Sequence, residues 1–200
     1  MNQKQLLVDC ITFEFVKDNL FEEAVRDQNR RLIVKGILQR AKVKNQNGRV
    51  YPKDILVREA EKYTATRIAE KRAFGELDHP DSAQISGQTT SHTVEKIYWK
   101  GDDLCGIIEI LDTPCGNIVR NILKAGKTLG ISSRGAGTVK QINENTVEVQ
   151  DDFDLICWDF VTDPSTHGAF MRPISEGRTN QKIDKYSKVN EVVMNILKGI

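Results

Sequence analysis

Two neighbouring serines in the stretch GISSRGAG, residues 130–137, could carry out acyl transfer. Serine attacks a carbonyl when a neighbouring base takes its proton and when hydrogen-bond donors stabilise the oxyanion that develops. Ser132 or Ser133 could be the nucleophile. Arg134 would add positive potential, and Gly135 would let backbone N–H groups turn inward. The stretch therefore offers parts for both a nucleophile and an oxyanion site.

The general base is sought among the three histidines, because imidazole titrates nearest neutral pH. His79, in GELDHPD, lies in a carboxylate-rich loop, from which a reactive side chain can reach substrate. His92 alternates with strand residues in TSHTVEKIYW and is expected at the surface or on a pocket wall. His167, in PSTHGAF, follows a Pro-Ser turn and is open to either role.

Each feature also has a plainer interpretation. The serines can be ordinary strand hydroxyls, Arg134 can pair with a surface carboxylate, and His79 can be a solvated loop histidine. Ser-Ser-Arg-Gly is a weak string, so the local sequence alone favours this interpretation.

Neither a metal site nor a disulfide framework is expected. Glu76, Asp78, His79 and Asp81 could offer ligands, but they lack HExxH-type helical spacing, and one turn rarely supplies a full coordination shell. The cysteines are scattered without CxxC pairing and are expected to fill strands and helices. They are Cys10, Cys105, Cys115 and Cys157.

Strands that could position the serines are indicated by hydrophobic spacing and turn residues. One is expected within residues 32–44, and a hairpin is expected around KGDD at 100–103. Two more are expected at 127–142 and 146–161, joined by a turn at NEN. The first of these two contains both serines.

Helices are expected over residues 51–72 and, after an N-cap at Thr113, over residues 117–125. The polar stretch 75–90, rich in Gly, Pro and Asp, is expected to be a long loop. The sum is an α+β fold: an antiparallel, barrel-like β-sheet with several packed helices.

Composition excludes several classes of protein. Hydrophobic residues make up 39% and charged residues 28% of the 200 residues, which is ordinary for a soluble globular chain. The net charge of +1 predicts no strong attraction to nucleic acid or anionic lipid. MNQKQLLVDC lacks the apolar region of a signal peptide, and no apolar run approaches membrane-spanning length. Neither nucleic acid nor a membrane is expected as a partner.

Four strings are more specific in combination than any of them alone. They are NGRVYPKDILVREAEKY, GELDHPD, IYWKGDDLCGIIEILDTPCGNIVRNILKAGKTLGISSRG and WDFVTDPSTHGAFM. In order and spacing they resemble the prohead core proteases of large contractile-tailed phages, over roughly residues 32–172.

The resemblance implies a serine endopeptidase that acts inside the immature capsid, within the prohead in the host cytoplasm. Its expected substrates are internal scaffold proteins, major capsid proteins and finally the enzyme itself. It implies no metal or organic cofactor, and a fold similar to that of the herpesvirus maturation proteases. Whether the protein forms a homo-oligomer stays open.

The resemblance also assigns roles to residues. The histidine of the GELxHP string falls on His79, the general base, and the first serine of SSRG falls on Ser132, the nucleophile. Ser133 would be a structural or hydrogen-bonding neighbour. Arg134 and Gly135 would lie at the oxyanion side.

The third catalytic member stays open between three residues. Asp159, in WDFVTDPS, is ranked first because an aspartate there could orient and stabilise a protonated His79. His167 is ranked second because the herpesvirus enzymes use a second histidine. Asp163 is ranked third and would rather cap the turn that follows it.

The protease domain is expected to span residues 1–176, followed by a polar tail over 177–200. Relatives of this type cut after glutamate, with an aliphatic residue two positions earlier. The Glu176–Gly177 bond is therefore a hypothesis for self-cleavage. The amphipathic stretch 189–197 in the tail could dock on scaffold, dock on another protease copy, or pack on the core.

Two other classes of protein compete with the protease. A non-catalytic capsid or scaffold protein of related architecture would not need His79, Ser132 and an acid to converge. A cellular serine hydrolase with a small-molecule substrate would show a deep apolar pocket in place of an extended groove.

Overall fold

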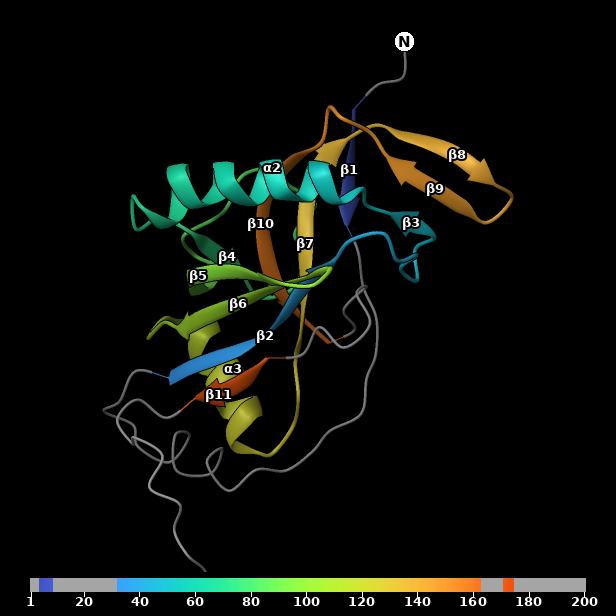
Figure 1. Cartoon of the computed structure of the whole chain (residues 1–200). Coiled ribbons are helices and arrows are strands. Elements are labelled where there is room, and N and C mark those ends of the chain that lie inside the picture. The colour runs from blue at the N-terminus through green and yellow to red at the C-terminus, as the bar shows by residue number, and fades with distance from the viewer. Residues whose placement is uncertain (1–3, 9–31, 163–170, 175–200) are drawn as a thin grey trace, which may run out of the picture.

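The computed structural model describes residues 4–8, 32–162 and 171–174, which form an α+β fold of three sheets and two helices (Figure 1). The tail over 177–200, with its stretch 189–197, lies outside the described residues. The helices are α2 (Lys53–Tyr63), which a π-helical turn, Thr64–Ile68, continues, and α3 (Pro114–Lys124). The strands are β1 (Gln5–Val8), β2 (Leu32–Arg40), β3 (Arg49–Val50), β4 (Phe74–Glu76), β5 (Thr90–Lys100), β6 (Asp103–Ile110), β7 (Gly130–Gly137), β8 (Val139–Asn143), β9 (Thr146–Val149), β10 (Asp154–Val161) and β11 (Arg172–Ile174).

The largest sheet has five strands, all antiparallel, in the order β11-β2-β6-β5-β4. Its centre is the predicted hairpin: β5 and β6 meet at a turn in which Gly101 has a φ of 64°, a value that favours glycine. The expected loop at 75–90 is wrong at its start, because Gly75 and Glu76 pair with β5 as part of β4. This three-residue strand is too short to show alternation in the sequence.

The second sheet holds β7 between β1 and β10, and it carries the serines. Seven of the eight residues of β7 are buried, all except Ala136, so the strand is covered on both faces. Glycines make this possible: a Cβ on Gly135 would lie 2.4 Å from the ring of Phe153. Gly135 is therefore required for close packing.

The two long strands expected at 127–142 and 146–161 each break in two. Thr138 marks the first break, where its backbone N–H and its hydroxyl both donate to the Asp152 carboxylate at 2.9 Å. The halves beyond the breaks, β8 and β9, join β3 in a separate sheet with the order β3-β9-β8. The strands of the described residues thus form three sheets and do not close into the expected barrel.

Both expected helices are present (Figure 1): α2 contacts β10, and α3 contacts β5 and β6. Thr113 caps α3 as predicted, because its Oγ1 accepts a hydrogen bond from the Gly116 N–H at 3.0 Å. The same hydroxyl donates to the Thr90 carbonyl at 2.6 Å, which ties α3 to the start of β5. No helix in the described part of the chain is long and apolar enough to cross a membrane.

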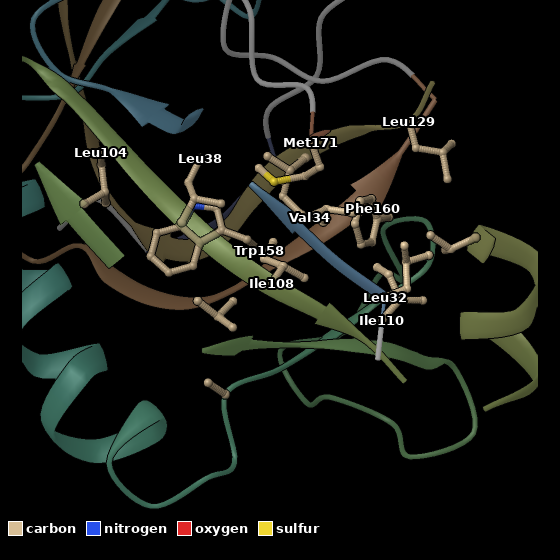
Figure 2. Packing of buried hydrophobic residues seen from close by; sticks show 14 of the residues in the cluster. Leu32, Val34, Leu38, Leu104, Ile108, Ile110, Leu129, Trp158, Phe160 and Met171 are labelled. Carbon is tan, nitrogen blue, oxygen red and sulfur yellow. The ribbon is translucent and has the colours of Figure 1, made fainter. Parts of the chain in front are cut away.

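The main core packs β10 against the five-stranded sheet, and Figure 2 shows Trp158 and Phe160 among the aliphatic side chains of β2 and β6. Trp158 and Phe160 are fully buried, and the ring of Tyr63 meets Trp158 edge to face at 4.9 Å. Trp158 and Phe160 flank Asp159 in the chain. Because successive side chains of a strand point to opposite faces, their burial in the core directs Asp159 the other way.

Candidate active site

Ser132 and Asp159 lie opposite each other in the antiparallel pair of β7 and β10. Side chains directly opposed in this way have Cβ atoms about 4.5–5.5 Å apart. A β-bulge at Ile156 sets this register, since Leu155 pairs with Gly135 but Cys157 pairs with Arg134. The bulge thus aligns the carboxylate with the first serine of the pair.

His79 is held beside Asp159 by the loop that follows β4. Its Nδ1 lies 2.9 Å from Asp159 Oδ2. The loop is fixed to β10 just before the histidine. Leu77 forms an isolated parallel β-bridge with Phe160, and the Asp78 N–H donates to the Phe160 carbonyl at 2.8 Å. Asp78 has a φ of 63°, which is uncommon for a residue other than glycine and is typical of sites where surrounding contacts hold a strained backbone.

Ser132 Oγ and His79 Nε2 have no hydrogen-bond partner among the described residues. Both atoms are buried, and buried polar atoms without a partner are rare. They are the atoms that a nucleophile and its general base would use. Catalytic hydrogen bonds of this kind are often long in a protein without substrate.

Ser133 and Arg134 differ in orientation because β7 alternates. Ser133 points to the face opposite Ser132, and Arg134 shares the face of Ser132. The guanidinium of Arg134 is fully buried and lies among acids: Nε is 3.0 Å from Asp159 Oδ2, and Nη2 contacts the Glu76 carboxylate. The guanidinium is therefore paired with buried carboxylates, so the plainer expectation of a surface ion pair is wrong.

Glu76 was considered only as a metal ligand in the sequence, yet it is a buried member of this cluster. Its backbone N–H donates to Asp159 Oδ1 at 2.9 Å. Its carboxylate binds Arg134 and also accepts hydrogen bonds from the Ser86 N–H, at 3.0 Å, and from the Thr89 hydroxyl. Among the described residues, no group of three or more His, Cys, Asp or Glu side chains could hold a metal ion.

His92 is fully buried, so the expectation of a surface or pocket-wall position is wrong. Burial lowers its pKa to about 4, and the ring is neutral at neutral pH. Its Nε2 lies 3.0 Å from the Trp158 carbonyl, which can only accept, so Nε2 carries the proton and Nδ1 accepts from the Ser91 hydroxyl at 2.8 Å. His92 thus supports β10 just before Asp159.

Gly75 lets β4 approach this support. A Cβ there would lie 2.2 Å from the Trp158 carbonyl oxygen and 2.3 Å from His92 Nε2. We expect Gly75→Ala to lower the free energy of unfolding by about 3 kcal/mol or more, because buried backbone must move. Gly87→Ala is the matched control, since a Cβ there meets nothing within 4 Å. Urea denaturation of the two variants would contradict the packing argument if their midpoints were equal.

A pocket of about 720 Å³ lies beside the loop that follows Ser82. Arg67 from the π-helical turn, Arg72 and Phe74 line one part of it, and Ala83 and Ile85 line another. Ser132 and His79 are not among its lining residues, so it is not a deep pocket centred on the serine.

Asp163 and His167, the two other candidates for the third catalytic member, lie outside the described residues. Of the residues predicted for catalysis, the described part of the chain brings Ser132, His79 and Asp159 together.

Comparison with known proteins identifies relatives over most of the chain. Residues 12–179 match the family described as prohead core protein serine protease. The chain is 34% identical over 171 residues to the prohead core protein protease of Enterobacteria phage T4, an alignment that covers 82% of this chain and 72% of the relative. It is also similar to the solved structure of the bacteriophage T4 capsid assembly protease, with a TM-score of 0.68 and 29% identity over 80% of this chain and 98% of that one.

Proposed function

Because the chain belongs to the family of prohead core protein serine proteases, we propose that it is a serine endopeptidase that uses Ser132, His79 and Asp159. Its substrates would be the internal scaffold and major capsid proteins of a phage prohead, and the enzyme itself. The observation that carries the proposal is the alignment of Asp159 with both partners: it faces Ser132 across the strand pair and is hydrogen-bonded to His79. A structural capsid protein would not need this convergence.

In the proposed mechanism, Asp159 accepts a hydrogen bond from the Nδ1–H of His79, which keeps the proton on Nδ1 and leaves Nε2 as the proton acceptor. Nε2 takes the proton of Ser132 as Oγ attacks the scissile carbonyl. The tetrahedral intermediate collapses to an acyl-enzyme when His79 returns that proton to the leaving amine, and water later releases the acyl group by the same route. Cys157 is no rival nucleophile, since burial and then Asp159 raise the pKa of its thiol well above the usual range.

The oxyanion would be stabilised by backbone N–H groups near Ser132. Ser133, Arg134 and Gly135 remain the candidates from β7. The guanidinium of Arg134 is already bound to Glu76 and Asp159, so this residue would contribute through its main chain. The likeness to herpesvirus maturation proteases that the resemblance implies stays a prediction.

The proposal predicts that the purified chain cuts the scaffold or major capsid protein of its own phage into discrete fragments. Electrophoresis and intact-mass measurement of the products check this. In the same reaction, the mass of the enzyme should fall to that of residues 1–176 if the Glu176–Gly177 bond, which lies outside the described residues, is cut. Scaffold and capsid proteins that stay intact at capsid-like protein concentration would favour the non-catalytic structural role.

A further inference from the structure

Three charged side chains are sealed inside the site. Glu76, Arg134 and Asp159 come from β4, β7 and β10, and the side chain of each is 0% exposed. Burial removes the water that would otherwise screen these charges, so each one acts strongly on its neighbours. The net charge of these three side chains therefore affects the pKa of any group that gains or loses a proton beside them.

Arg134 connects the three catalytic segments. It lies two residues after Ser132 and pairs with Asp159 through Nε. Its Nη1 donates to the Ser82 carbonyl at 2.8 Å and to the Pro80 carbonyl at 3.3 Å. Pro80 directly follows His79, so one guanidinium holds the nucleophile strand, the acid and the loop of the base in a fixed relation.

Such an arginine also creates a problem for catalysis. Asp159 stabilises a protonated His79 through its negative charge, and Arg134 at 3.0 Å would cancel that charge if it had no other partner. Glu76 is the other partner. Its carboxylate accepts from Arg134 and from two donors of the loop, Ser86 and Thr89, which fix its orientation.

The other buried titratable groups that interact with Asp159 carry no charge at neutral pH, and the acids on the loop of His79 are in water. Burial lowers the pKa of His92 to about 4, and burial raises the pKa of both Tyr63 and the Cys157 thiol. Asp78 and Asp81, on the loop of His79 itself, are exposed. The buried titratable or charged side chains that interact with Asp159 or with Arg134 are Tyr63 (α2), Glu76 (β4), His92 (β5), Arg134 (β7), and Cys157 and Asp159 (β10).

Two carboxylates and one guanidinium leave a net charge of −1 in the buried cluster, which a protonated His79 brings to zero. We propose that Glu76 is a positioning residue that holds Arg134 and offsets its charge, so that Asp159 keeps its own charge for the imidazolium formed during catalysis. This inference rests on the proposed function. It assigns Glu76 an electrostatic task that acts through Arg134 and Asp159, without contact with substrate.

The test replaces Glu76 by glutamine, which keeps the shape of the side chain and removes its charge. The rate at which a fluorophosphonate labels Ser132 is measured against pH, and kcat and KM are measured with a cleaved peptide. We expect Glu76→Gln to lower the labelling rate and kcat by about 10- to 100-fold, with KM little changed. The acid limb of the pH profile should move to lower pH, because a protonated His79 loses a neighbouring negative charge.

Glu59→Gln is the matched control. Glu59 is a carboxylate on α2 that is equally buried and also contacts β10, where it accepts from the Leu155 N–H at 3.0 Å. Its substitution should leave the acid limb in place. Thermal melting of both variants shows how much of each protein is folded. Unfolding lowers the fraction of protein that can be labelled, whereas the proposed effect lowers the labelling rate of the folded enzyme.

Arg134→Met should shift the acid limb in the opposite direction, to higher pH, because it removes a positive charge from the cluster beside His79. The double variant Glu76→Gln with Arg134→Met restores the net charge and should return the limb towards its original position. If the wild type is labelled at Ser132 and Glu76→Gln has the same labelling rate and acid limb as Glu59→Gln, this inference is overturned and the proposed function stays intact. A wild type that is not labelled at Ser132 would overturn both.

Discussion

Ser132→Ala is expected to reduce cleavage of scaffold or capsid protein by about ten-thousandfold or more, while Ser133→Ala keeps most of the activity. The two serines are neighbours in β7, yet they point to opposite faces, and only Ser132 lies opposite Asp159. Ser132 Oγ also has no hydrogen-bond partner among the described residues, so its removal leaves no group unpaired there. The loss should therefore appear in the rate and leave the stability nearly unchanged.

The measurement is the initial rate of fragment formation for wild type and both variants, with melting temperatures recorded in parallel. Ser133→Ala is a closely matched control for Ser132→Ala, because both serines are buried, at 3% and 1% exposure. Loss of activity with Ser133→Ala alone would move the nucleophile by one residue and contradict the register argument. Full activity in both variants would show that neither serine of β7 is the nucleophile.

Asp159→Asn is expected to lower kcat by about a thousandfold or more, because an amide no longer enforces the tautomer in which His79 Nε2 accepts the serine proton. His167→Ala, which removes the rival third member, should change kcat little. Steady-state kinetics of the two variants with one peptide substrate compare the candidates directly.

Stability must be followed in this experiment, because Asp159 also accepts hydrogen bonds from the Glu76 N–H and the Cys157 thiol. Asp159→Asn keeps an acceptor oxygen for these donors, so the folded fraction should remain high enough to assay. If His167→Ala abolished cleavage and folded Asp159→Asn retained it, the assignment would pass to the histidine. Asp163→Asn, measured alongside, tests the last candidate.

The sequence predicted those elements whose determinants are local. The α3 helix follows from the Thr113 cap and the apolar spacing after it, and the β5–β6 hairpin follows from two apolar runs around Gly101. The breaks that separate β7 from β8 and β9 from β10 were missed. They depend on contacts such as that between Thr138 and Asp152, which join residues 14 positions apart.

The grouping of the candidate site residues was predicted in part for the same reason. The strings quoted for the resemblance place roles on His79, Ser132 and Asp159, and the fold brings these residues together. The role of Arg134 was not predictable from its neighbours, because its partner Glu76 lies 58 positions away, on a different sheet. His92 was misplaced because alternation along a strand does not tell which face a later element will cover. Its burial depends on Phe160, whose ring packs on it at 4.6 Å.

The placement of the proposed catalytic residues on two sheets has a consequence for when cleavage could begin. His79 follows β4 of the five-stranded sheet, while Ser132 and Asp159 belong to the sheet of β7 and β10. A ribosome that has released only the first 150 residues has produced the proposed base and nucleophile but neither the proposed acid nor β10, which packs against the five-stranded sheet. On the proposed assignment, a chain could therefore cleave a neighbour only after β10 had left the ribosome exit tunnel and paired with β7.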